Sequence, residues 1–230
     1  MMDNHWLNEA IYNNAVWCHA IAASHGISSK WETSAWVSQH SMPPLYPNII
    51  TLRSGKLIDE QISAVRSQLP LGWAIKDSFA ELELKDKGFT HAFNAYWYCR
   101  TPHQNVIDEY NPVLHIETVK TRLELNAWVI AWGDSKRVFN DSLLENKAVE
   151  LIYMTRNGKV LAGLATNHSS ESVGMSNAFG KPDDVLSCVA SVIRKYPDKG
   201  IVGYGNEAEI ATLSILGFKE TGNLRIWLCR

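Results

Sequence analysis

The sequence lacks any apolar run long enough to cross a membrane, because even the apolar stretch 127–132 ends at Gly133 and Asp134. A transmembrane helix needs about 18 or more predominantly apolar residues in a row. The first residues also lack the features of a secretory signal, since Asp3 and Glu9 stand where a basic start and an apolar run would be. We therefore expect a cytoplasmic protein that does not use a membrane as its partner.

The net charge is small as well, at -2 at pH 7, with a pI near 6.4. Proteins that hold nucleic acid or an anionic membrane surface depend on a basic surface for much of their affinity. The charge therefore argues against both classes of partner.

Cysteine is scarce, and the four that occur lie far apart: Cys18, Cys99, Cys188 and Cys229. None belongs to a C-x-x-C pair, the spacing typical of zinc sites and redox dithiols. We expect free thiols, buried or half-buried, in a reducing compartment, and we predict no metal site.

Apolar and aromatic residues, by contrast, are plentiful. Hydrophobic residues make up 46% of the chain and charged residues 20%, as in globular proteins and unlike disordered ones. The nine tryptophans are many for 230 residues, and most are expected in a core or an interface. A chain of this length folds as one large domain or two small ones.

Hydrophobic spacing and turn signals predict helices and strands in alternation. Helices are predicted at 5–23, 58–69, 77–87, 122–132, 183–195 and 206–216. Strands are predicted at 45–52, 73–75, 91–100, 113–117, 149–154, 159–166, 173–179, 201–204 and 223–229. The clearest local signals are Asn157-Gly158, which indicates a hairpin, and Thr121, which suits a helix N-cap. The alternation predicts an α/β (α+β) fold, with a mixed, twisted sheet flanked by helices.

One order of elements occurs twice: strand, helix, short strand, helix, Gly-Phe, strand. Residues 77–89 align without gaps with residues 206–218. The aligned identities are Leu84 with Leu213 and Gly88-Phe89 with Gly217-Phe218, while Gly55-Lys56 and Gly180-Lys181 precede the earlier helix of each set. The repeat predicts a tandem arrangement, with a degenerate partial copy in residues 1–105 and a full copy in residues 108–230.

The first copy is expected to be incomplete, because no hairpin is predicted before Leu45. A half-sheet without its early strands has an open edge that must be paired or covered. We therefore expect both copies to share one continuous sheet, or to pack edge to edge, within one compact unit. The helix 5–23 would cover the junction, and residues 1–105 should not fold alone.

The second copy ends in a characteristic set of residues: Asn206 at a helix start, Leu213 within that helix, and the turn Leu216-Gly217-Phe218. With the preceding hairpin, residues 111–230 resemble the GNAT acetyltransferase superfamily. The resemblance implies a GNAT-like fold and an acyl-CoA-dependent N-acyltransferase. Its cofactor would be acetyl-CoA or another acyl-CoA, and its substrate a small-molecule or peptide amine.

In that family a loop of pattern R-x-x-G-x-[GA] holds the cofactor's pyrophosphate on backbone N–H groups at a helix N-terminus. The corresponding residues here are 181–186, in which Lys181 keeps the cation but Asp184 and Leu186 replace the small residues. We expect the two carboxylates of the first turn to cap the helix themselves and to repel a phosphate. The resemblance gives these candidate cofactor-binding residues: Phe179, Gly180, Lys181, Asp183, Asp184 and Asn206.

The family's general acid is a tyrosine four residues before the glycine of the Gly-Phe turn, and the equivalent residue here is Leu213. Tyr204, at the end of the neighbouring short strand, is therefore the candidate catalytic residue. The alternative is that Tyr204 is a half-buried strand residue without a catalytic role. No pair of carboxylates stands out as a general base.

Two other functions stay open. One is a catalytically inactive GNAT-fold module that binds or senses another small ligand. The other is a protein-interaction subunit, in which the tryptophans would form a face for a homodimer.

Overall fold

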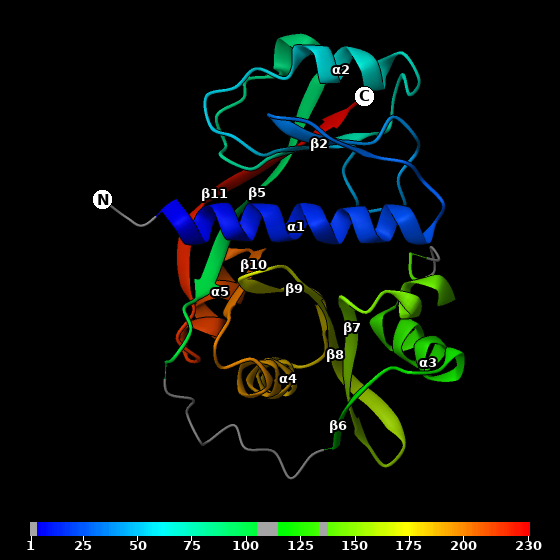
Figure 1. The fold of residues 1–230 in the computed structure, drawn as a ribbon, viewed down its shortest axis with the longest axis vertical. Helices are drawn as coiled ribbons and strands as arrows, with labels where there is room; N and C mark the ends of the chain where they lie inside the picture. Colours follow the sequence, from blue (N-terminus) through cyan, green and yellow to red (C-terminus); the bar gives the residue numbers. More distant parts are fainter. Residues whose placement is uncertain (1–3, 105–114, 134–137) are drawn as a thin grey trace.

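The computed structural model describes residues 4–104, 115–133 and 138–230, and these form a mixed sheet with helices on both faces (Figure 1). The helices are α1 (Asn4–Ser24), α2 (Asp59–Arg66), α3 (Arg122–Trp132), α4 (Pro182–Lys195) and α5 (Glu207–Ser214), with short 3-10 helices η1 (Lys85–Lys87) and η3 (Asp141–Glu145). The first strands are β1 (Lys30–Trp31), β2 (Ala35–Val37), β3 (Ile49–Thr51), β4 (Ala74–Asp77) and β5 (Phe89–Arg100). The later strands are β6 (His115–Thr118), β7 (Val149–Arg156), β8 (Lys159–His168), β9 (Ser172–Phe179), β10 (Gly200–Gly205) and β11 (Lys219–Cys229). The predicted α/β class is confirmed.

The strands follow the order β1-β2-β3-β4-β11-β5-β10-β9-β8-β7-β6 in a single sheet. The last strand, β11, lies between β4 and β5, while β5 lies between β11 and β10. The β3–β4 and β9–β10 pairs are parallel, and the other neighbours are antiparallel. Counted outward from the central β11–β5 pair, both sides have the same succession of strand pairings: antiparallel, parallel, antiparallel, antiparallel. Strand β6 then extends one side by a further strand. Such an order agrees with an internal repeat, which itself stays a prediction.

The amino-terminal half has more strands than predicted. Strands β1 and β2 pair with each other, and β2 pairs with β3, all antiparallel. The expectation that no hairpin precedes Leu45 is therefore wrong. Strands of two and three residues are too short to show an alternating pattern, and all of β2 is buried rather than half-buried.

The predicted helix at 77–87 is also wrong. Strand β4 runs up to Asp77, and only η1 is helical in this stretch. The buried Asp77 carboxylate accepts hydrogen bonds from the backbone N–H groups of Leu82, at 2.9 Å, and Glu81, at 3.3 Å. An aspartate that binds nearby backbone N–H groups in this way stabilises a turn instead of a helix.

Helix α1 crosses the middle of the sheet, between the strands of the two halves (Figure 1). It packs against β5, β9 and β10, as expected for a helix that covers the junction. Together with α3 and η3 it covers one face, while α2, α4 and α5 cover the other. Alternate residues of β5 show the two faces, since Trp97 packs beneath α1 and Tyr98 packs on the α4 side.

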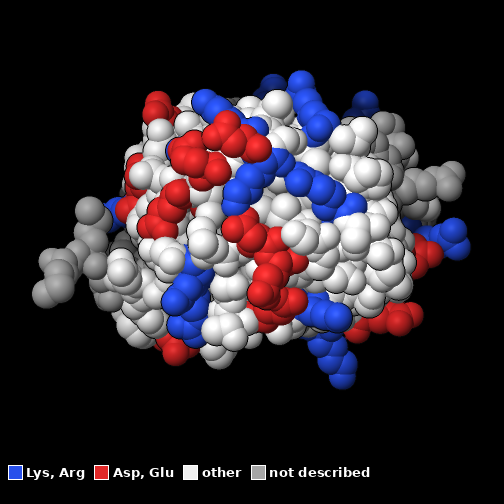
Figure 2. All heavy atoms as spheres, turned by 90° about the horizontal axis from the view of Figure 1, so that it is seen from above, with Lys and Arg blue, Asp and Glu red and all other residues white. Residues whose placement is uncertain are grey.

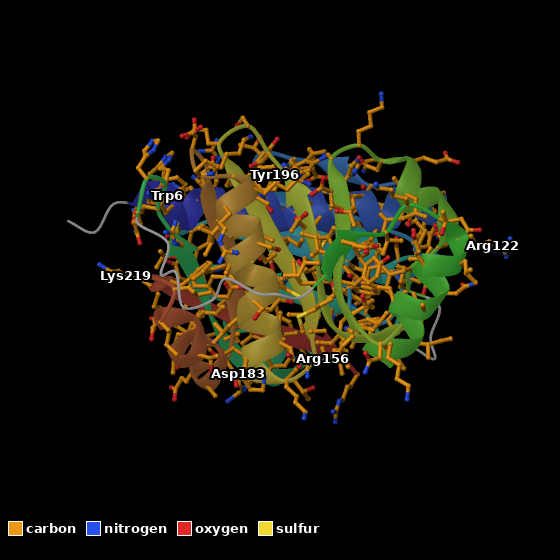
Figure 3. All side chains as sticks on the ribbon, turned by 90° about the horizontal axis from the view of Figure 1, so that it is seen from below. Trp6, Arg122, Arg156, Asp183, Tyr196 and Lys219 are labelled. Carbon is orange, nitrogen blue, oxygen red and sulfur yellow. The ribbon has the colours of Figure 1, made fainter. Side chains whose placement is uncertain are left out.

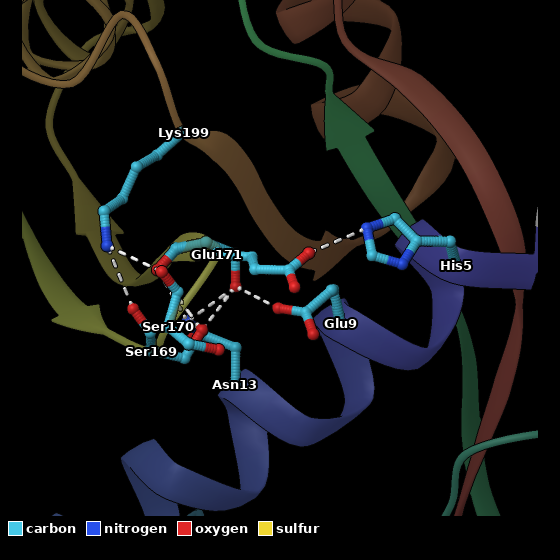
Figure 4. A network of polar contacts seen from close by, with 8 residues as sticks. His5, Glu9, Asn13, Ser169, Ser170, Glu171 and Lys199 are labelled. Atoms are coloured by element: carbon cyan, nitrogen blue, oxygen red, sulfur yellow. Dashed lines mark hydrogen bonds and ion pairs between the residues drawn. The ribbon is translucent and has the colours of Figure 1, made fainter.

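A buried amide fixes α1 to the end of β8 and the start of β9 (Figure 4). The Nδ2 of Asn13 donates to the Asn167 carbonyl at 3.3 Å and to the Ser172 hydroxyl at 3.2 Å. Ser172 in turn donates to Glu9, and His5 lies 3.2 Å from Glu171. These contacts hold the amino-terminal helix to the carboxyl-terminal half of the chain.

Most tryptophans are core residues. Six of the nine are buried, namely Trp17, Trp36, Trp73, Trp97, Trp128 and Trp227, and Trp31 is 41% exposed. They therefore do not form an exposed face for a partner, and the homodimer stays a prediction. All four cysteines are buried free thiols, as expected.

Local signals in the carboxyl-terminal half are confirmed. Asn157 and Gly158 have positive φ angles of 52° and 71° in the turn between β7 and β8. Thr121 caps α3 in a reciprocal pair with Glu124. Within the described ranges no helix combines the length and apolarity that a membrane span requires. On the face shown in Figure 2, acidic and basic side chains are interspersed, so this face offers no broad basic area to a polyanion.

Candidate functional site

The parallel strands β9 and β10 separate partway along their length. They pair only where Gly200–Val202 meets Ser172–Gly174. Beyond that point β9 follows β8, with an irregular register between Gly163 and Ala165, and Asn177 has a positive φ of 54°. A cavity of about 1020 Å³ lies at this opening. Its size is at the upper end of the range for ligand pockets, about 300–1,000 Å³.

The cavity receives side chains from both faces of the sheet. Tyr204 and Lys76 come from the face covered by α1, while Val185 and Leu213 come from the helices on the opposite face. The separation of β9 from β10 therefore connects the two faces through the sheet.

The predicted site residues gather at this opening. Four of them line the cavity: Phe179, Gly180, Tyr204 and Asn206. The other three, Lys181, Asp183 and Asp184, follow at the start of α4, where Lys181 and Asp183 are exposed and Asp184 is half-buried. Figure 3 shows α4 from below, with Asp183 at one end and Tyr196 at the other.

Gly180 is required by the backbone at this point. Its φ is +120°, and a Cβ atom there would lie 2.5 Å from the Cβ of Ala162 and 2.8 Å from the carbonyl oxygen of Leu161. Only glycine fits both the angle and the close approach. The chain can therefore turn from β9 into α4 directly against β8.

Helix α4 begins without a side-chain cap. Lys181 is its N-cap residue and makes no capping hydrogen bond, and Pro182 follows in the first turn. Neither Asp183 nor Asp184 accepts a hydrogen bond from the helix start within the described structure, so the expected self-capping by these carboxylates is not found. Helices α3 and α5, by contrast, both have reciprocal caps. The first-turn N–H groups of α4 are left for another acceptor.

Asn206 caps the start of α5 with its side-chain oxygen. Its Oδ1 accepts from the N–H of Glu209 at 3.0 Å, and Glu209 accepts from the N–H of Asn206 at 2.8 Å. A role for Asn206 in cofactor binding therefore rests on its side-chain N–H groups, and stays a prediction.

Tyr204 is half-buried at the end of β10 and contacts two residues of the α1 face. Its ring makes an edge contact with Trp97, with centroids 5.5 Å apart, and lies 4.0 Å from the Nζ of Lys76. Its hydroxyl has no hydrogen-bond partner among the described residues. Leu213, the residue that the family resemblance aligned with a tyrosine, is buried and lines the same cavity from the opposite face.

Sequence reasoning missed the polar residues that the amino-terminal half contributes. Lys76 is 2% exposed, and its Nζ donates to the Oδ1 of Asn14 at 2.6 Å. The hydroxyl of Tyr46 donates to the Oδ1 of Asn177 at 3.1 Å. The one available signal was a lysine directly after the apolar run Trp73-Ala74-Ile75.

Burial raises the pKa of one thiol and two phenols that line the cavity. It raises the pKa of the Cys18 thiol to about 11, although nearby Lys76 acts in the opposite direction. Burial also raises the pKa of Tyr46 and of Tyr98. At neutral pH Cys18 is therefore a thiol and a poor nucleophile, since the thiolate is the reactive form.

The similarity of this chain to known proteins lies in its three-dimensional structure and not in its sequence. No protein-family model and no curated protein matches the chain. The GCN5-related N-acetyltransferase from Kribbella flavida has a TM-score of 0.70 at 10% identity, covering 96% of this chain and 95% of its own. The GCN5-related N-acetyltransferase-like protein from Streptococcus suis has a TM-score of 0.58 at 9% identity, with 100% of both chains covered. A functionally unknown conserved protein from Staphylococcus epidermidis has a TM-score of 0.60 at 11% identity, covering 88% and 94%.

These identities are too low to transfer an activity, but the similarity in structure extends over nearly the whole chain, including the strands before residue 105. The separated strands β9 and β10, the start of α4 and the Gly217-Phe218 turn all lie within that shared architecture. The chain has the fold of the GNAT, or GCN5-related N-acetyltransferase, superfamily.

Proposed function

We propose that the chain is an acyl-CoA-dependent N-acyltransferase that transfers an acyl group, such as acetyl, to a small-molecule or peptide amine. The observation that carries this proposal is the opening between β9 and β10, where a cavity reaches both faces of the sheet. An acyl donor and an amine can enter from opposite faces and meet there, so that proximity supplies much of the catalysis. The fold neighbours named as N-acetyltransferases support an acetyltransferase-type function.

The start of α4 suits the phosphates of an acyl-CoA. Its first-turn N–H groups have no side-chain acceptor, and the helix dipole favours an anion at this end. Lys181 adds an exposed cation that forms no ion pair with any residue the structure describes. Asp183 and Asp184 oppose a phosphate in the same turn, so we expect modest affinity.

The edge of β9 suits the extended part of such a cofactor. From Met175 onward this edge no longer pairs with β10, so its backbone N–H and C=O groups face the cavity without a strand partner. An extended ligand can hydrogen-bond to such an edge as an added strand does. When bound there, the thioester supplies the activated acyl group.

Tyr204 is the residue we propose for proton transfer. Its hydroxyl has no protein partner within the described structure, it lines the cavity, and it can donate a proton to the sulfur that leaves. The reaction needs no covalent enzyme intermediate, which agrees with the protonated Cys18 thiol.

Titration of acetyl-CoA tests the cofactor site. We expect Lys181→Ala to weaken binding, and Asp184→Gly to strengthen it by about 1 kcal/mol, roughly fivefold, because it removes a like charge from the helix end. Lys159→Ala removes an exposed cation from the β7–β8 hairpin and serves as the matched control, without effect. Equal affinity in wild type and Lys181→Ala would contradict the placement.

The second candidate function is a GNAT-fold module that binds a ligand without catalysis. Leu213 favours it, because a buried leucine stands where the family has its proton donor. Binding of acetyl-CoA to Asp184→Gly alone, with none to the wild type at millimolar ligand, would support this module over the enzyme.

A further inference from the structure

The cavity contains a buried lysine that neither the fold nor the proposed reaction explains. Lys76 lies on β4, in the amino-terminal half, and is the only lysine or arginine among the cavity-lining residues of the described structure. Its side chain contacts the Oδ1 of Asn14 and the ring of Tyr204, both of which also line the cavity. The ammonium group is thus directed into the cavity and not toward solvent.

Among the residues that the structure describes, Lys76 has no anion to balance it. No carboxylate of the described residues lies within ion-pair distance of its Nζ. Glu209, the one carboxylate among the described residues that line the cavity, is engaged in the cap of α5. A buried cation without a partner is costly, so such a group is ordinarily paired with an opposite charge. A ligand that brings one negative charge would supply the pair.

The amino-terminal half also contributes apolar side chains that line the cavity and reach the surface. Leu45, Leu71 and Phe93 line the cavity and are 72%, 65% and 50% exposed. Leu45 also has a positive φ of 75°, an uncommon backbone angle for a leucine. Exposed apolar side chains around an opening mark a surface for an apolar group of a ligand.

We propose that Lys76 and Asn14 form a carboxylate subsite, so that the acyl acceptor is an amine that carries one carboxylate and an apolar body. This inference rests on the proposed function, because it names the acceptor of that reaction. The single cation matches the single charge of a carboxylate, whereas a phosphate dianion would leave one charge unbalanced. Asn14 orients the Lys76 ammonium group, and the exposed Leu45, Leu71 and Phe93 receive the apolar body of the acceptor.

Direct binding of product-like compounds tests the subsite without turnover. N-acetylphenylalanine carries the carboxylate, and N-acetylphenethylamine has the same amide and ring without it. We expect the wild type to bind the first roughly tenfold to hundredfold more tightly, the range of a charge-assisted hydrogen bond. Equal affinity for the two compounds would overturn the proposal.

Two variants separate recognition from folding. Lys76→Met keeps the length of the side chain and removes the charge, so the preference for the carboxylate should disappear. Asn14→Asp places a carboxylate beside Nζ, supplies the missing anion from within the protein, and should also abolish the preference while the fold is kept. Lys199→Met, at a lysine that binds the carbonyls of Ser169 and Ser170, is the matched control and should leave the preference unchanged.

The outcomes distinguish this inference from the proposed function. A carboxylate preference that is lost in Asn14→Asp supports the subsite even if acetyl-CoA does not bind, and in that case only the acyltransferase fails. A preference that persists in Asn14→Asp and Lys76→Met overturns the subsite even if acetyl-CoA binds to the wild type.

Discussion

Gly174 shows how closely α1 is fitted to the sheet at the level of a single residue. A Cβ atom at this position would lie 1.8 Å from the Oδ1 of Asn13 and 2.6 Å from the Oδ1 of Asn167. Both side chains are buried and belong to the hydrogen bonds that join α1 to β8 and β9. The glycine is therefore needed for space.

We expect Gly174→Ala to lower the free energy of unfolding by about 1–3 kcal/mol, because the buried amides must move to admit the methyl group. Urea unfolding measures the change. In the background of Asn13→Ala the same substitution should cost less, since the nearest atom has been removed, and the double-mutant cycle gives the difference. Additive effects of the two substitutions would show that Asn13 does not restrict the space.

The sequence predicted part of the candidate site at the residue scale. Phe179, Gly180 and Tyr204 were found because the family pattern fixes where β9 ends and where β10 ends, and both ends line the cavity. Lys76 was missed because its role arises from contacts with Asn14 and Tyr204, which lie on other elements far away in the sequence. A pattern of neighbouring residues in the sequence does not indicate contacts between such distant elements.

At the scale of elements, the carboxyl-terminal end of α4 is tied to β7. Lys195 and Tyr196 donate to the Glu150 carboxylate at 2.7 Å and 2.9 Å. Burial alone would raise the pKa of Glu150, but these hydrogen bonds outweigh it and lower the pKa. His168, on β8, packs edge-on against Tyr196, with ring centroids 4.7 Å apart.

His168 should make the stability depend on pH. Burial lowers its pKa below the ordinary 6.5; Lys199 and Lys195 act in the same direction, and Glu150 acts against them. The unfolded chain then takes up a proton more readily than the folded one, so stability is lost as the pH falls below 6.5. We expect His168→Gln to lose less stability than the wild type between about pH 7.5 and about pH 5.5, measured by urea unfolding. An equal or larger loss in the variant would contradict this.

Elements with strong local signals were predicted well, and those set by distant contacts were not. The cap at Thr121 and the turn at Asn157-Gly158 each depend on residues close together in the sequence, and both are confirmed. The stretch after Asp77 has helical spacing, yet the buried carboxylate binds the backbone and makes a turn. Strands β1 and β2 form because they pair with each other and β2 pairs with β3. Their two and three residues are too few to show this in the sequence.

At the scale of the whole molecule, the two halves exchange their final strands. Strand β5 pairs with β10 and β11, and β11 pairs with β4 and β5. A chain cut between the halves would leave each fragment without a strand from the middle of its sheet. The GNAT fold was predicted from the order of elements. The exchange of strands was not predicted, because the order of elements does not show which strands pair across the halves.

We expect neither residues 1–105 nor residues 108–230 to fold alone, and an equimolar mixture of the two to form a folded complex. The reason is that β4 and β5 lack β11 in the first fragment, and β10 and β11 lack β5 in the second. Amide spectra of each fragment and of the mixture provide the measurement. Well-dispersed signals from either fragment alone would show that its own strands suffice.

The exchange also affects how the chain folds as it is made. Strand β5 is complete once residue 100 has been added, but its neighbour β11 begins only at residue 219. At about 5–20 residues per second, the interval is on the order of ten seconds. Until β10 is made, both edges of β5 are unpaired, and one edge of β5 and one of β4 stay unpaired until β11 follows. Such edges can join with those of other nascent chains. Chaperones that cover exposed strands should therefore affect the yield of this protein in the cell more than its final stability would suggest.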